Sequence, residues 1–278
     1  MTNVIKLGLP VRQWVPNWLA VVSLFIIILP VTMLNGLYTG SMLEVSSTMG
    51  IYSEDITMGY YAASAGMAIA YPIVPKILDN YAAKFVLLTD LILQFFLSWI
   101  CAHAQNADIL IICSFLIGFL KGFLMLWFIR FSMKVFSPKN VRSEFYSYFY
   151  PLVFTGGQVS MVLTAELAYH YNWQYMYYFM MILLLVAILV VIVMYRYNRP
   201  MKKMAVAEFH FREMCIISTG LLMIMYVINY GKVLDWMAST RICVYLVVAP
   251  ALIAFLYGCS IIRKNRMLIW HHCISLKQ

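Results

Sequence analysis

Ionisable side chains inside long apolar segments are the residues of this sequence best suited to chemistry. Lys121, Asp90 and Glu166 each interrupt a run of about 20 mostly apolar residues, the length of a membrane-spanning helix. A charge at the centre of a bilayer costs about 3 kcal/mol on insertion scales, so such a residue is expected to have a function or a partner. The chemistry open to a single amine or carboxylate there is proton transfer or the binding of a solute.

Each of these residues also has a structural interpretation. Lys121 either lines a water-filled path or forms a buried ion pair with Asp90. Asp90 lies about 9 Å from the cytoplasmic end of its segment, so it either reaches the interface or acts within the membrane. Glu166 precedes the aromatic stretch Tyr169–Trp173 and is either an interfacial carboxylate or a protonatable group at the mouth of a cavity.

Uncharged polar residues add hydrogen-bonding capacity in the same segments. Gln158 and Asn35 can each bond a neighbouring helix or a solute. His271 and His272 are adjacent, so they do not share a helix face, and neither a metal site nor a cofactor is expected. We find no nucleotide-binding loop, zinc-protease motif or Ser/His/Asp pattern, so the chain is not expected to be an enzyme.

The elements that carry these residues are predicted to be membrane helices. The 278 residues are 64% hydrophobic and 11% charged, whereas a soluble domain has about 25% charged residues. The fold class is therefore an all-α membrane protein, because helices satisfy their own backbone groups in lipid. Eight spans are predicted, at Trp18–Tyr38, Ile56–Val74, Phe85–Ala102, Ile109–Ile129, Tyr146–Ala168, Met176–Met194, Met214–Tyr230 and Ile242–Ile262.

Basic residues set the predicted orientation. With the N-terminus inside, seventeen of the 20 Lys and Arg residues are cytoplasmic, two are outside, and Lys121 is within a span. This asymmetry predicts a multi-pass protein of the cell (cytoplasmic or inner) membrane with both termini cytoplasmic. The net charge of +9 therefore reflects topology, and nucleic acid is not expected as a partner. The predicted parts are a six-helix bundle (1–195), a basic loop (196–212), a helix pair (213–262) and a tail (263–278).

Four stretches have recognisable spacing. Residues 75–84 read PKILDNYAAK, with Asp79 and Lys84 as its matching charges, and residues 118–122 read GFLKG. Small residues at 160–165 are followed by NWQYMY at 172–177. The most specific stretch is GKVLDWMAS at 231–239, which contains Gly231, Asp235 and Trp236. These stretches resemble motifs of the fourteen-helix drug:proton antiporter branch of the major facilitator superfamily, in which two six-helix halves flank an inserted helix pair.

The resemblance implies functions for particular residues. It places Lys121 on a helix that lines the central cavity. The candidates for the substrate or proton pathway are therefore Lys121, Asp90, Glu166, Gln158 and Asn35. Two further sets follow from the motif positions. Asp79 and Lys84 correspond to a conformational-switch loop, and Gly231, Asp235 and Trp236 to the linker of the helix pair. The implied activity is proton-coupled multidrug efflux by alternating access of two halves around a midplane site.

Partners and alternatives follow from the number of helices. The lipid bilayer and a small-molecule substrate are expected, and eight helices resemble one half plus the inserted pair. The chain is thus expected to be a fragment, or one subunit of a split transporter, that needs a C-terminal half or a second copy of itself. Two small-residue stripes either face that second bundle or pack within the first; they are Gly59, Ala63, Gly66, Ala70 and Gly156, Ser160, Thr164. A non-transporting eight-helix scaffold or sensor, or a membrane-embedded enzyme, is the alternative function.

Overall fold

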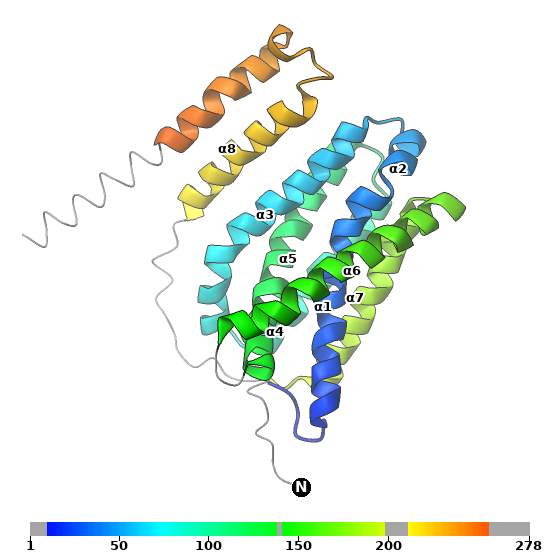
Figure 1. The fold of residues 1–278 in the computed structure, drawn as a ribbon, viewed down its shortest axis with the longest axis vertical. Coiled ribbons are helices and arrows are strands. Elements are labelled where there is room, and N and C mark those ends of the chain that lie inside the picture. Colours follow the sequence, from blue (N-terminus) through cyan, green and yellow to red (C-terminus); the bar gives the residue numbers. More distant parts are fainter. Residues whose placement is uncertain (1–9, 138–140, 198–210, 256–278) are drawn as a thin grey trace, which may run out of the picture. The chain divides into compact units, whose positions relative to one another are not determined.

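The computed structural model describes residues 10–137, 141–197 and 211–255, without the side chains of residues 34–39, 134 and 211–214. The described residues fall into two compact units, one within Met1–Ala207 and one within Glu208–Gln278. The first unit contains α1 (Asn17–Gly40), α2 (Met42–Met49), α3 (Ser53–Asn80), α4 (Ala83–Ala102), α5 (Ala107–Phe136), α6 (Arg142–His170) and α7 (Gln174–Met194). These helices are labelled in Figure 1.

Every predicted span coincides with a helix of the described residues, the last of them as far as Phe255. In the described part of the chain, three helices are long and apolar enough to cross a bilayer, over Ala83–Ala102, Ala107–Met133 and Gln174–Met194. Shorter apolar helices cover Asn17–Met33, Cys215–Tyr230 and Thr240–Phe255. The two remaining predicted spans lie in α3 and α6, which are long but less apolar because Gly, Ser, Thr and Tyr recur along them. The prediction of an all-α membrane fold is thus confirmed, while the full set of eight spans is supported only in part.

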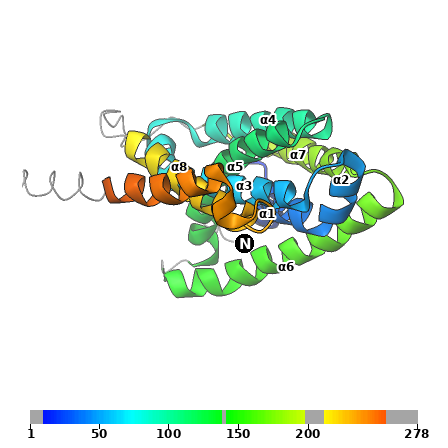
Figure 2. The ribbon, with the colours of Figure 1, turned by 90° about the horizontal axis from the view of Figure 1, so that it is seen from above.

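The helices of the first unit form an arc. α3 packs on α5, α5 on α4, α4 on α7, α7 on α1, and α1 on α6. Seen from above in Figure 2, α4 and α7 lie along one side of this unit, α6 lies along the opposite side, and α1, α3 and α5 lie between them. The two ends of the arc are therefore α3 and α6.

The closest packing in the arc joins α3 to α5. A Cβ atom added at Gly122 would lie 2.5 Å from the Cβ of Ala70, and one added at Gly118 would meet the backbone of Ala63. One added at Gly66 would meet the backbone of α5. Small residues allow such close approach of helix backbones. The predicted stripe of small residues on α3 is thus buried against α5, within the bundle.

The second stripe packs on α1. A Cβ atom added at Gly156 would lie 2.8 Å from the Cβ of Thr32. The Ser160 hydroxyl donates a hydrogen bond to the carbonyl of Met33, and Thr164 lies beside Gly40. The hypothesis that these two stripes face a second bundle is therefore wrong.

The segment that precedes α1 is joined to the segment that follows α7. Val11 and Tyr195 form an isolated antiparallel bridge, in which the Arg12 amide donates to the carbonyl of Met194 at 2.8 Å. The Tyr195 ring lies 5.6 Å from that of Trp127 in α5, centroid to centroid. Its hydroxyl lies 3.1 Å from the hydroxyl of Ser23 in α1. Tyr195 therefore joins α7 to two other helices at one end of the bundle.

The second unit is a helix pair. α8 (Phe211–Tyr230) is followed by the short 3-10 helix η2 (Trp236–Ala238) and by a helix over Thr240–Phe255. Tyr226 stacks on Tyr230 at 4.5 Å and meets Tyr245 edge to face at 5.1 Å. These rings hold the two helices together at the end nearest their linker.

Candidate functional site

A partly open cavity lies at the open side of the arc, between α3 and α6. The cavity has a volume of about 330 Å³, and its lining includes Tyr60 from α3 and Gln158 from α6. The other lining residues come from α6 and are Tyr150, Val153, Phe154, Gly157 and Met161. The Gln158 amide and two tyrosine hydroxyls make this surface more polar than the outside of α4 or α7. The structure thus places Gln158, a predicted site residue, where the bundle opens.

Lys121 is buried in α5, with 8% of its surface exposed. Gly118 and Gly122, three residues before and one after it, face α3. Phe119 and Phe123, two residues before and after it, line a separate groove beside α4. Residues two apart on a helix are about 160° apart around its axis, so Lys121 projects away from that groove.

Asp90 is buried in α4, with 3% of its surface exposed. It lines the groove from which Lys121 projects away. Its Oδ2 accepts a hydrogen bond of 2.9 Å from the Gln94 amide, one turn along the same helix. Its Oδ1 has no hydrogen-bond partner among the described residues. The interpretation as an ion pair with Lys121 is therefore wrong, and Asp90 bonds within its own helix and not to a neighbouring loop.

The other pathway candidates are separated from these two. Glu166 is 66% exposed in its side chain and pairs with His170 at 3.2 Å, one turn along α6. This exposed position agrees with its interpretation as an interfacial carboxylate. Asn35 belongs to α1, but its side chain is outside the described residues. The structure therefore does not bring the five predicted pathway residues together in one cluster.

The loop between α3 and α4 is anchored by its two predicted charges. Asp79 pairs with Arg130 of α5 at 2.6 Å. The Lys84 ammonium donates to the carbonyls of Ile192 at 3.1 Å and Tyr195 at 2.8 Å. These carbonyls are at the C-terminal end of α7, which is the negative end of the helix dipole. The loop therefore connects three helices, and Arg130, which the sequence indicated only as a topology signal, is one of its partners.

The linker of the helix pair has an unusual backbone. Asp235 and Trp236 both have positive φ, at 52° and 47°. The Trp236 amide donates to the carbonyl of Gly231 at 2.8 Å, and a Cβ atom at Gly231 would lie 2.6 Å from the Trp236 ring. Only glycine leaves room for this ring, which gives a physical reason for the Gly and Trp spacing of the linker.

No group of three His, Cys, Asp or Glu residues suited to a metal ion occurs in the described part of the chain. His271 and His272 lie outside the described residues.

Comparison with known protein families gives a match over most of the chain. The sequence profile of the Major Facilitator Superfamily matches residues 21–270. A search of curated proteins found no significant match. The profile covers both units and every described helix from α2 onward in full. The chain therefore belongs to the Major Facilitator Superfamily, whose members are multi-pass membrane proteins that carry solutes across membranes and are in general not enzymes.

Proposed function

We propose that this chain supplies one half and the inserted helix pair of a proton-coupled exporter of small, drug-like molecules. Residues 1–195 form the transporting bundle, 196–212 a basic cytoplasmic loop, 213–262 the helix pair, and 263–278 a cytoplasmic tail. Membership of the superfamily supports transport, and the Gly231, Asp235 and Trp236 linker favours the fourteen-helix branch. Both termini are cytoplasmic in this proposal, because seventeen Lys and Arg residues then lie inside and two outside.

The observation that carries the proposal is the open side of the arc. Its cavity of about 330 Å³ combines aromatic surface with the Gln158 amide, and pockets for small molecules typically combine apolar walls with few polar groups. Tyr60 and Tyr150 border it from the two helices at the ends of the arc. Lys121 is buried in α5 between these ends and is the proposed group that responds to protons or to substrate charge.

Alternating access supplies the mechanism. One bundle rocks against another around a midplane site, so transport requires a second bundle on the open side of this one. The exposed side chains of Tyr150 and Phe154 on α6 are available for that contact. A C-terminal half or a second copy of this chain is the proposed partner.

Solute uptake into everted membrane vesicles tests the proposal. We expect accumulation of a fluorescent lipophilic dye that stops when a protonophore removes the proton gradient, in vesicles that hold this chain together with its second half. Lys121→Ala and Gln158→Ala should lower uptake at unchanged abundance in the membrane. Val162→Ala is the matched control, because Val162 is exposed on the same helix and does not line the cavity.

Two results would contradict parts of the proposal. If Lys121→Ala and Gln158→Ala both showed wild-type uptake, the open side of the arc would not be the transport route. Protonophore-sensitive uptake by this chain alone would show that a second copy, and not a separate half, completes the transporter.

A further inference from the structure

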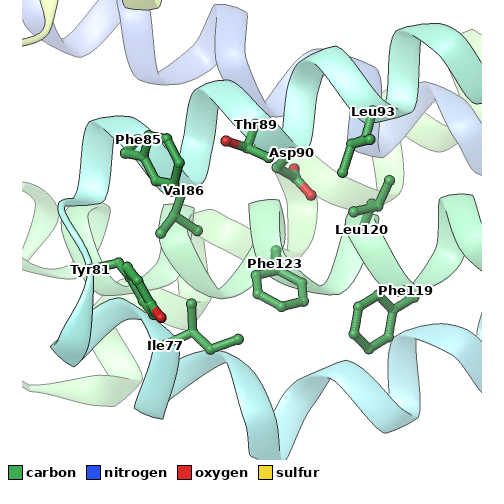
Figure 3. Close-up of a pocket in the computed structure, with 10 residues that line it drawn as sticks. All are labelled: Ile77, Tyr81, Phe85, Val86, Thr89, Asp90, Leu93, Phe119, Leu120 and Phe123. Atoms are coloured by element: carbon green, nitrogen blue, oxygen red, sulfur yellow. The ribbon is translucent and has the colours of Figure 1, made fainter. Parts of the chain in front are cut away.

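An apolar groove lies on the first unit, away from the open side of the arc. It runs between the end of α3, the first half of α4 and the middle of α5, and its volume is about 290 Å³. Its lining, drawn in Figure 3, consists of Ile77, Tyr81, Phe85, Val86, Thr89, Asp90, Leu93, Phe119, Leu120 and Phe123. None of these residues lines the cavity between α3 and α6. The groove is therefore a separate site.

One carboxylate stands out in this apolar lining. Figure 3 shows the Asp90 side chain directed into the space between Leu93, Leu120 and Phe123. One of its oxygens is bonded to Gln94, and the other, Oδ1, has no hydrogen-bond partner among the described residues although 97% of the residue is buried. Buried polar atoms are nearly always paired, so an open acceptor aimed into a groove indicates a missing donor.

The groove is accessible from the outside of the bundle. Tyr81, Phe85 and Leu93 are each about half exposed. The large exposed side chains of α4 are all apolar, as expected for a helix that faces lipid, and include Phe85, Ile92, Leu93, Phe96 and Trp99. A ligand of this groove therefore arrives through the bilayer.

We propose that this groove binds a small lipophilic amine, whose protonated nitrogen donates a hydrogen bond to Asp90 Oδ1. The aliphatic or aromatic body of the amine occupies the apolar lining, and the rings of Phe119 and Phe123 lie beside its positive charge, where they attract cations. The carboxylate supplies the opposite charge that a cation needs in a dry site. A carboxylic acid is excluded by repulsion, and a neutral hydroxyl donates only a weaker hydrogen bond to the open acceptor than a protonated amine does.

The dimensions favour a free amine over an aminophospholipid. Asp90 lies about 10 Å along α4 from Ala83, the first residue of the helix, so a headgroup at the interface does not reach it. The volume of about 290 Å³ is at the small end of ligand pockets. The site goes beyond the proposed function because it lies off the proposed transport route.

Equilibrium binding tests the assignment. The probe is tritiated 1-adamantylamine, added to the full chain in phosphatidylcholine nanodiscs, with 1-adamantanol as a neutral competitor of the same shape. We expect saturable binding that the alcohol displaces only at a concentration at least about tenfold higher than the unlabelled amine, because its hydroxyl is a neutral donor. Asp90→Asn should weaken it by about tenfold or more, because the charge-assisted hydrogen bond is lost while Gln94 keeps an acceptor. Glu166→Gln, which neutralises an exposed carboxylate, should leave binding unchanged.

A second variant keeps the test decisive if Asp90→Asn is not recovered from membranes. Leu93→Trp fills the groove from an exposed position and should also abolish binding. The proposal is overturned by wild-type affinity in either variant, by equal displacement with 1-adamantanol, or by displacement when phosphatidylethanolamine is added to the nanodiscs. Gln158→Ala should leave amine binding intact, so failure of the transport proposal and failure of this one give different results.

Discussion

The contact between α3 and α5 predicts how a single methyl group should destabilise the bundle. In Gly122→Ala the new Cβ atom would lie 2.5 Å from the Cβ of Ala70, whereas ordinary van der Waals contact begins at 3.4 Å. The two helices must therefore separate locally by about 1 Å. Overpacking of this kind costs about 1–3 kcal/mol in the free energy of unfolding. That corresponds to a fall in melting temperature of roughly 3–10 °C for a chain of this size.

The same contact predicts which second substitution restores stability. Ala70→Gly removes the atom that Gly122→Ala would strike, so the double variant should regain most of the loss. Gly118→Ala instead strikes the backbone of Ala63, which Ala63→Gly cannot remove, so that pair should show no rescue. Thermal unfolding of the purified variants in detergent gives the coupling free energy of each pair.

Gly157→Ala is the control for helix propensity. It lies within α6 with open space around its Cα, so it should raise stability by about 0.5–1 kcal/mol through helix propensity alone. Equal melting temperatures for Gly122→Ala and Gly157→Ala would refute the close packing of α3 on α5. So would rescue of Gly118→Ala by Ala63→Gly.

Three further predictions concern other parts of the chain. Lys84→Ala removes the two hydrogen bonds that the Lys84 ammonium donates to carbonyls at the end of α7. It should lower the free energy of unfolding by about 1 kcal/mol, measured by thermal unfolding, while Lys84→Gln should lose less. Gly231→Ala should displace the Trp236 ring, seen as a change in tryptophan fluorescence; an unchanged spectrum would contradict the contact. A reporter fused after Arg266 should be cytoplasmic, and one inserted within Lys232–Arg241 external. A cytoplasmic reporter within Lys232–Arg241 would contradict the eight-span topology.

The sequence predicted the positions of the helices because apolar runs of span length have few alternatives in lipid. It did not predict their ends, since a helix continues past the hydrocarbon region as long as its backbone bonds are satisfied. α5 thus runs from Ala107 to Phe136 and not from Ile109 to Ile129. The short α2 was missed, although Gly50 was an available signal: its φ of 65° is the left-handed conformation that ends many helices.

The surroundings of the polar residues were harder to predict. α4 is apolar nearly all round, so hydrophobic periodicity does not say which neighbour Asp90 faces. The one available signal was Gln94, four residues on and therefore on the same face. Gln158 was expected from the sequence to bond another helix or a solute, but its position at the open side depends on how α6 packs on α1, which no local pattern specifies.

The placement of the two buried charges relative to α5 limits what each can do. Lys121 and Asp90 were treated together from the sequence because opposite charges in lipid are expected to pair. In the fold, α5 stands between them: Phe119 and Phe123 turn toward the groove of Asp90, and Lys121 is on the other side of the same helix. If Lys121 and Asp90 formed an ion pair, that pair alone would explain both buried charges. Their separation leaves a carboxylate with an open acceptor directed into the groove and an amine on the opposite side of α5, so the two residues need different chemical explanations.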